Sequence, residues 1–358
     1  MKLKFIQLTN LLWQQTLESI RHDIYHLPEY VESEAQRIKA TPEAILISDN
    51  EKQFFVPYLL RSGKDLFNEN SKYQDFFDVI SPYGYPGILL NESAASAPEF
   101  IELAMDRLIS AFRDRGICSA FLRLHPILHS HLNEILSPEI CKLTGETVSI
   151  NLKLPEAEIW HQTRPEHRTK INKCKRAGMT AKMVDFEAYI HEFIEIYKET
   201  MTRVGAAESY YFSYDYFSQL SRLGEKLHLC IVELEGQVTC AGLFTECCGI
   251  VQYHLGATKN EFLKIAPSKL LFDYVRFWAK ERGNEVFHLG GGLGGAKDSL
   301  YHFKAGFSKQ RHNFLTLHLI PDPQKYHHLL VDRANHLKME AENLLKTNFF
   351  PAYRWSPH

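Results

Sequence analysis

The chain has 358 residues, of which 45% are hydrophobic and 23% charged, the balance of a globular protein of about two domains. Lysine and arginine number 41 and aspartate and glutamate 43, for a formal net charge of −2. A protein that acts mainly on DNA or RNA usually has a large basic surplus, so we expect no DNA partner and at most a local basic patch.

We expect neither a membrane-spanning helix nor a secretory signal. No run of about 18 uninterrupted apolar residues is present, which excludes a spanning helix. Near the start, Gln7, Thr9 and Asn10 interrupt the apolar segment that a signal peptide would need. We therefore expect a cytoplasmic protein.

The cysteine and histidine patterns predict no metal. The 7 cysteines are odd in number, and the adjacent pair Cys247 and Cys248 suits neither a disulfide framework nor a zinc site. Two histidine pairs, 129/131 and 327/328, lack cysteine or carboxylate partners at ligand spacing. We expect reduced cysteines and no bound metal.

The first half of the chain has the pattern of an α/β unit. Its expected elements are, in order, a strand, a strand end with a turn, a helix and a strand, at residues 53–60, 78–87, 97–115 and 117–124. The helix carries apolar residues at Phe100, Ile101, Ala104 and Leu108, the spacing of a buried stripe, and it is expected to end at Gly116.

The second half repeats this order. Its expected elements are a hairpin, a third strand, a helix and a strand, at residues 227–234 with 238–245, 250–257, 267–282 and 285–289. The repeat predicts two similar α/β (α+β) units with mixed, mostly antiparallel sheets flanked by helices.

Two further segments complete the domain organisation. A basic stretch at 164–176, with Glu166 as its one acid, joins the halves. A helix over 326–345 precedes an aromatic tail at 349–355, which is too apolar for a solvated end and should pack on the N-terminal domain. We expect three parts: an N-terminal domain, a C-terminal domain, and a docking helix and tail, over 1–146, 147–322 and 323–358.

Five glycines fall within residues 290–295, directly after an expected strand. Gly290, Gly292 and Gly295 satisfy GxGxxG, but the long helix and downstream acid of a dinucleotide site are missing. A phosphate loop fails as well, since Asp298 stands where serine or threonine is needed. The alternatives are a flexible turn and a backbone that passes close to a ligand; we favour the second.

The segment that follows, Leu300-Tyr301-His302-Phe303-Lys304-x-Gly306-Phe307, resembles the Fem-type aminoacyltransferases and related GNAT-fold proteins. The resemblance covers residues 1–322 and is strongest over 250–307. It rests on an ordered set of features: the basic helix, the hairpin, the glycine cluster and the segments 81–87, 200–203, 253–258, 266–269 and 282–283.

This resemblance implies two tandem GNAT-like domains that transfer an acyl or aminoacyl group to an amine. Fem members use aminoacyl-tRNA as donor and peptidoglycan precursors as acceptor. The chain departs from them in lacking room for the helical-hairpin arm of some members. The loop that would bind acetyl-CoA, residues 260–268, contains no glycine, so its amides approach a pyrophosphate less easily. We expect no resident cofactor, and either aminoacyl-tRNA or acyl-CoA as co-substrate.

Three residues are the candidate catalytic groups. Lys304, by its place in the family segment, would stabilise the oxyanion of acyl transfer, with Phe303 packing beneath it. His254 is the candidate base, because histidine is a common general base and its strand borders the site that the resemblance implies. The structural alternatives are a surface lysine, a core phenylalanine and a core histidine.

Further residues are candidates for substrate binding. The resemblance implies that Arg203 contacts phosphates, which suits bidentate arginine pairing. The structural alternative is a cation that stabilises the C-terminal end of a helix. The basic stretch would meet a tRNA or diphosphate, although such runs are commonly solvated helix faces. The full set is Arg203, Arg168, Lys175, Tyr83, Tyr85, Gly291, Gly292 and Tyr301.

The sequence thus predicts an acyltransferase that forms an amide on a cell-envelope precursor, such as a nucleotide- or lipid-linked peptide or amino sugar. A lipid-linked acceptor would imply peripheral membrane contact. The alternatives are an acyl-CoA-dependent N-acetyltransferase of a small amine and a non-catalytic binding module, with an NAD-dependent dehydrogenase last.

Overall fold

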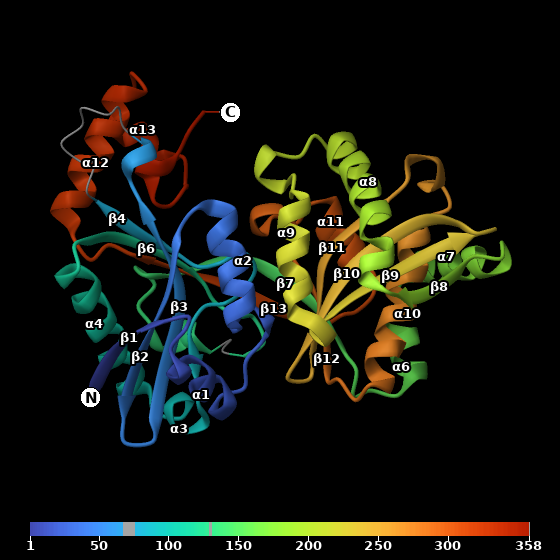
Figure 1. Ribbon diagram of the computed structural model, residues 1–358, viewed down its shortest axis with the longest axis horizontal. Coiled ribbons are helices and arrows are strands. Elements are labelled where there is room, and N and C mark those ends of the chain that lie inside the picture. The colour runs from blue at the N-terminus through green and yellow to red at the C-terminus, as the bar shows by residue number, and fades with distance from the viewer. Residues whose placement is uncertain (67–75, 129–130, 358) are drawn as a thin grey trace. The chain divides into compact units, whose positions relative to one another are not determined.

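The computed structural model describes residues 1–66, 76–128 and 131–357 (Figure 1). It contains two compact units. Unit 1 comprises residues 1–144 and 313–358, and unit 2 comprises residues 145–312. Residues 313–322, which the sequence pattern places in the C-terminal domain, lie in unit 1 in this division.

The sheet of unit 1 has the strand order β1-β2-β3-β4-β6-β13, and β5 also pairs with β3. Its strands are β1 (Lys2–Gln7), β2 (Thr41–Asp49), β3 (Lys52–Ser62), β4 (Phe77–Ile80), β5 (Leu89–Leu90), β6 (Ile117–Arg123) and β13 (Arg311–Leu319). Strands β4 and β6 are parallel, while the pairs β1–β2, β2–β3, β3–β4, β3–β5 and β6–β13 are antiparallel.

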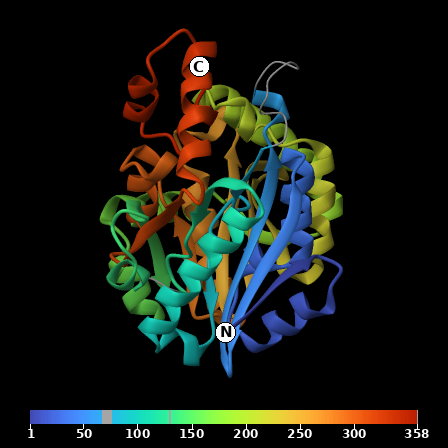
Figure 2. The same cartoon turned by 90° about the vertical axis from the view of Figure 1, so that its left-hand side faces the viewer.

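Helices cover both faces of this sheet (Figure 2). Alternate residues of β2 face opposite cores: Ile45 and Ile47 pack with α4, whereas Ala44 and Leu46 pack with α1 and α2. The helices preceding β7 are α1 (Leu11–Ser19), α2 (Pro28–Ile38), α3 (Glu92–Ala95), α4 (Pro98–Asp114) and α5 (Leu132–Ile135).

The C-terminal segment packs on unit 1, as expected, but not as one helix. It forms α12 (Pro323–His336) and α13 (Ala341–Lys346). Between them the backbone of Lys338 adopts a left-handed φ of 54°, which ends an α-helix. The apolar stripe continues across this break, so its periodicity alone predicted a single helix over 326–345.

Exposed His327 and His328 lie on α12, whereas His129 and Ser130 of the other candidate histidine group lie outside the described residues.

Unit 2 has the strand order β8-β9-β10-β11-β12-β7. Its strands are β7 (Cys141–Asn151), β8 (Thr180–Val184), β9 (Leu227–Leu234), β10 (Gln237–Cys247), β11 (Ile250–Thr258) and β12 (Val286–Gly290). The β11–β12 pair is parallel, which requires a crossover connection. Helix α10 (Pro267–Glu281) supplies it. Parallel β4 and β6 are the equivalent pair of unit 1, so the internal repeat is confirmed.

The helices of unit 2 lie on both sides of its sheet (Figure 1). Helices α8 (Phe186–Val204) and α9 (Tyr214–Leu220) cover one face. The other face carries α6 (Glu156–Gln162), α7 (Pro165–Arg176), α10 and α11 (Ser299–Ala305), which share one apolar core. Among the described residues, no helix has both the length and the apolar character needed to cross a membrane.

The C-terminal tail is held by a buried carboxylate. Asp78 is fully buried, and it accepts hydrogen bonds from Arg61 Nε (2.8 Å), Tyr353 Oη (3.0 Å) and Arg354 Nε. Because two arginines depend on this carboxylate, its removal would leave both charges without their buried counter-charge.

We predict that Asp78→Ala lowers the free energy of unfolding by about 3–5 kcal/mol, because it breaks a buried ion pair from one side. Urea denaturation measures this loss, and amide hydrogen exchange should show faster exchange in the tail around Tyr353. Asp49→Ala, which removes a half-exposed carboxylate of β2, is the matched control. Equal loss in both variants would contradict the proposed anchoring role.

Candidate functional site

The glycine cluster forms a tight turn, and other residues of unit 2 occupy the space beside its glycines. Asp298 caps α11 by accepting the Tyr301 N–H (2.8 Å), and it also accepts the Leu293 N–H (3.0 Å). A Cβ on Gly292 would collide with Asp298 and with the Ala296 carbonyl, and one on Gly291 would lie 2.7 Å from the Glu146 carbonyl. These two glycines are thus required by contacts within unit 2, a reason different from the expected approach to a ligand.

Lys304 is buried at the end of α11. Its side chain is 6% exposed, and Nζ donates a hydrogen bond to the Gly291 carbonyl (2.6 Å). The ammonium also lies 5.5 Å from the centre of the Tyr253 ring, a favourable cation–π position. Burial lowers the pKa of Lys304 to about 7, and the charge of Asp298 opposes this shift. The amine therefore exists in both charge states near neutral pH.

Phe303 packs in an aromatic group behind Lys304. Its ring centre is 5.2 Å from that of Phe272 and 5.4 Å from that of Phe307. Lys269 Nζ lies 5.4 Å from the same ring. Phe303 therefore supports α11 through its packing.

His167, which sequence reasoning missed, positions the end of α11. It lies in α7 with 6% exposure, and its Nε2 is 2.9 Å from the Phe303 carbonyl oxygen. Burial lowers the pKa of His167 to about 4, so the ring is neutral and Nε2–H donates this bond. A Cβ at Gly306 would collide with the ring. The spacing of buried His167, Ile171 and Cys174 along α7 is the signal that would have predicted an inward-facing histidine.

Tyr301 lies in a polar network with a residue of β7. Its hydroxyl donates to Glu146 Oε2 (2.9 Å) and accepts from Arg311 Nε (3.1 Å). Hydrogen bonds from Lys297 and then Tyr301 hold the pKa of Glu146 below its ordinary value. Sequence reasoning found Tyr301 but missed Glu146, because the two are 155 positions apart in the chain.

His254 is not brought to Lys304. It follows Tyr253 on β11, and the pairing of β11 with β10 passes from Tyr253 to Leu255, so His254 is the extra residue of a β-bulge. Its Nε2 lies 3.0 Å from Tyr216 Oη of α9, and the side chain is 7% exposed. Lys304 and His254 thus lie on opposite faces of the sheet of unit 2.

Arg203 joins the end of α8 to the end of β11. It donates to the Thr258 carbonyl (3.0 Å), to Asn260 Oδ1 and to Thr200 Oγ1 (3.3 Å). These bonds give it a structural role in addition to the expected contact with phosphate.

The basic stretch forms α7 and packs on α10. Lys175 pairs with buried Asp273 (2.8 Å), and Lys170 donates to the Lys264 carbonyl (3.1 Å). Arg168 is half-buried and directly follows His167. Burial, followed by the nearby charge of Lys170, lowers the pKa of Lys269. Lys170 and Lys269 thus bring positive charge from α7 and α10 together, whereas Lys175 is paired with a carboxylate.

Tyr83 and Tyr85 lie in unit 1, in the turn after β4. The Tyr83 N–H donates to Glu34 (3.1 Å) and its carbonyl accepts from the Tyr30 hydroxyl (3.1 Å). The Tyr85 ring lies 5.2 Å from that of Phe314. Both residues are half-buried.

Comparisons with known proteins identify a domain family for part of the chain. Residues 161–304 match the acetyltransferase (GNAT) domain family, so the matched region ends at Lys304. No curated protein sequence matches the chain.

Solved structures share the fold over most of the chain. FemX has a TM-score of 0.69 at 14% identity, covering 90% of this chain and 99% of its own. The C-terminal domain of a putative lysylphosphatidylglycerol synthetase from Agrobacterium fabrum has a TM-score of 0.53 at 14% identity, covering 87% and 92%. L-PGS from Bacillus licheniformis has a TM-score of 0.52 at 15% identity, with the same coverage. Residues 161–304 therefore match an acetyltransferase (GNAT) domain, and the chain as a whole shares the fold of FemX.

Proposed function

We propose that this enzyme transfers an aminoacyl or acyl group to the amine of a cell-envelope precursor, such as a nucleotide- or lipid-linked peptide or amino sugar. The observation that carries the proposal is a lysine amine buried against a carbonyl of the glycine cluster, at the end of the matched acyltransferase domain. The fold shared with FemX supports an aminoacyl donor. The fold shared with a synthetase named for a lysyl-bearing lipid supports an acceptor in the envelope.

In the proposed reaction the acceptor amine attacks the donor carbonyl and forms the new C–N bond. Negative charge develops on the carbonyl oxygen, the bond to the leaving oxygen or sulfur breaks, and the amine gives up a proton. Protonated Lys304 would stabilise the developing oxyanion, and its burial strengthens that interaction because the local dielectric is low. The Tyr253 ring would favour the charged form of the amine.

An acyl-CoA donor is the second candidate, favoured by the name of the matched family. Helix α10 begins after Ala266, whose φ is 62°, and no side chain caps its first turn. Pro267 has no N–H and the Lys269 N–H donates to the Ala266 carbonyl (3.1 Å), so this turn offers few N–H groups to a phosphate. The absence of glycine from 260–268 weakens this donor, because side chains hinder a close approach to a pyrophosphate.

The test is donor-dependent amide formation by the purified chain, followed by mass spectrometry of the acceptor. Aminoacyl-tRNA and acetyl-CoA are offered in turn with nucleotide-linked and lipid-linked peptides. Product with aminoacyl-tRNA supports the first candidate. Product with acetyl-CoA, together with calorimetric binding of CoA, supports the second. Binding of donors without turnover of any acceptor would contradict both and leave a binding module.

We predict that Lys304→Met lowers kcat by about 100- to 1000-fold, because it removes one stabilising group for the oxyanion while conserving side-chain volume. Steady-state amide formation measures the loss. Lys304→Arg keeps a cation above pH 7, so its kcat should fall less than that of the wild type as the pH rises through 7. Full activity of the Met variant would show that Lys304 is not the stabilising group.

The lowered pKa of Lys304 predicts a specific pH dependence of stability. Between pH 7 and the ordinary lysine value of 10.5, the amine is neutral in the folded chain and protonated in the unfolded one. Unfolding then takes up a proton, so stability rises with pH across this window. Relative to Lys304→Met, the wild-type free energy of unfolding should rise by at most about 1.4 kcal/mol per pH unit. Urea titrations at pH 7 and 9 check this, and parallel values for the two proteins would contradict it.

We predict that His167→Phe destabilises the chain by about 0.5–1.5 kcal/mol, because it removes one of two hydrogen bonds to the Phe303 carbonyl and leaves only that from the Gly306 N–H (3.1 Å). If His167 positions α11, kcat falls while KM for the donor stays near the wild-type value. His167→Gln, whose amide can donate in place of Nε2–H, should restore much of kcat. A Phe variant with wild-type kcat would limit His167 to packing.

A further inference from the structure

The tip of the β10–β11 hairpin has an unusual residue for its backbone. The two strands are joined by Cys248 and Gly249, and the pair Cys247 and Ile250 closes the turn. The turn residues have φ values of 45° and 79°, the pattern of a type I′ turn, which favours Asn-Gly or Asp-Gly. Cysteine is not among the residues enriched in the left-handed region.

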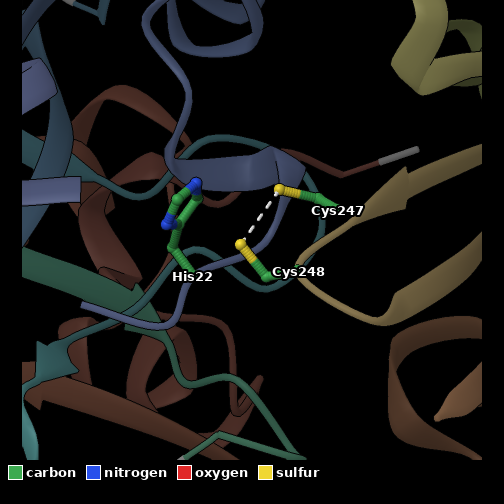
Figure 3. A group of neighbouring side chains, drawn as sticks. All are labelled: His22, Cys247 and Cys248. Carbon is green, nitrogen blue, oxygen red and sulfur yellow. Dashed lines mark hydrogen bonds between the residues drawn. The ribbon is translucent and has the colours of Figure 1, made fainter. Parts of the chain in front are cut away.

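The turn brings two thiols together (Figure 3). The Sγ atoms of Cys247 and Cys248 are 3.8 Å apart, and neither cysteine forms a disulfide. Cys247 is buried and Cys248 is exposed. Soft metal ions would therefore reach the pair from the side of Cys248.

The spacing fits metal binding better than a disulfide. The Cα atoms of residues joined by a trans peptide bond are about 3.8 Å apart, below the roughly 4.4–6.8 Å found across disulfides. By contrast, two thiolates bound tetrahedrally to zinc at about 2.3 Å have sulfurs roughly 3.8 Å apart. The observed Sγ–Sγ distance has this value.

The neighbouring carboxylate has other partners. Glu246 interacts with His228 (3.0 Å), Arg282 (2.9 Å) and Asn284 (2.6 Å). It therefore stabilises the base of the hairpin, and the two sulfurs are the ligands that the hairpin tip of unit 2 offers. Such a site leaves coordination positions open to water, as exchangeable zinc sites do.

We propose that Cys247 and Cys248 form a dithiolate site for a soft divalent cation of the zinc group. On binding, both thiols release their protons to solvent, and two metal–sulfur bonds replace two bonds from the hydrated ion to water. No redox change is involved. The site is independent of the proposed acyl transfer, because no step of that reaction uses either thiol. It also revises our sequence-based expectation that this adjacent pair suits no zinc site.

The test is titration of the reduced, metal-free full chain with Cd²⁺, whose bonds to thiolate absorb in the ultraviolet. We expect one strongly absorbing Cd²⁺ per chain and loss of one proton per thiol. Cys248→Asn and Cys247→Ser should each weaken Cd²⁺ binding by more than about tenfold, because each removes a ligand. Cys141→Ala removes a cysteine of β7 and is the matched control, with unchanged binding expected.

Cys248→Asn also separates binding from folding. Asparagine is favoured in this turn, so the variant should melt at or above the wild-type temperature while losing Cd²⁺. No charge-transfer absorption in the wild type would overturn the proposal. Wild-type affinity in both Cys248→Asn and Cys247→Ser would also overturn it, since the ion would then bind elsewhere.

Discussion

The hydrogen bond from the Lys304 amine to the Gly291 carbonyl is the constraint on which the site of unit 2 depends. It ties the end of α11 to the glycine cluster at the end of β12, and it can form only because Asp298 turns the chain back between them. An amine held in this way cannot move into water to keep its ordinary pKa. Its burial is therefore what makes Lys304 chemically useful near neutral pH.

The two faces of the sheet of unit 2 divide the candidate residues into two groups. Tyr253 lies on the face that carries α10 and α11, and His254 lies on the face that carries α9. Arg203 also belongs to the α8–α9 side, where it holds the end of β11. In the proposed acyl transfer at Lys304, the proton acceptor would therefore be a group other than His254.

Local sequence patterns were sufficient to predict most of the helices and strands and the internal repeat. The stripe of α4, the Pro267 start of α10 and the strands around residue 235 follow from spacing and turn residues that act within a few positions. The break before α13 was missed because Lys338 ends α12 without glycine or proline. His167 was missed because its role is set by Phe303, which is 136 positions away.

The sequence by itself determined the fold class, the duplicated α/β units and the presence of a lysine in a family segment after a glycine cluster. It did so because secondary structure and segment resemblance are properties of neighbouring residues. Only the tertiary structure decided that Lys304 is buried, that His254 faces away from it and that the glycines 291 and 292 accommodate Glu146 and Asp298. Burial, sheet face and close approach depend on residues distant in the chain, and no local pattern encodes those distances.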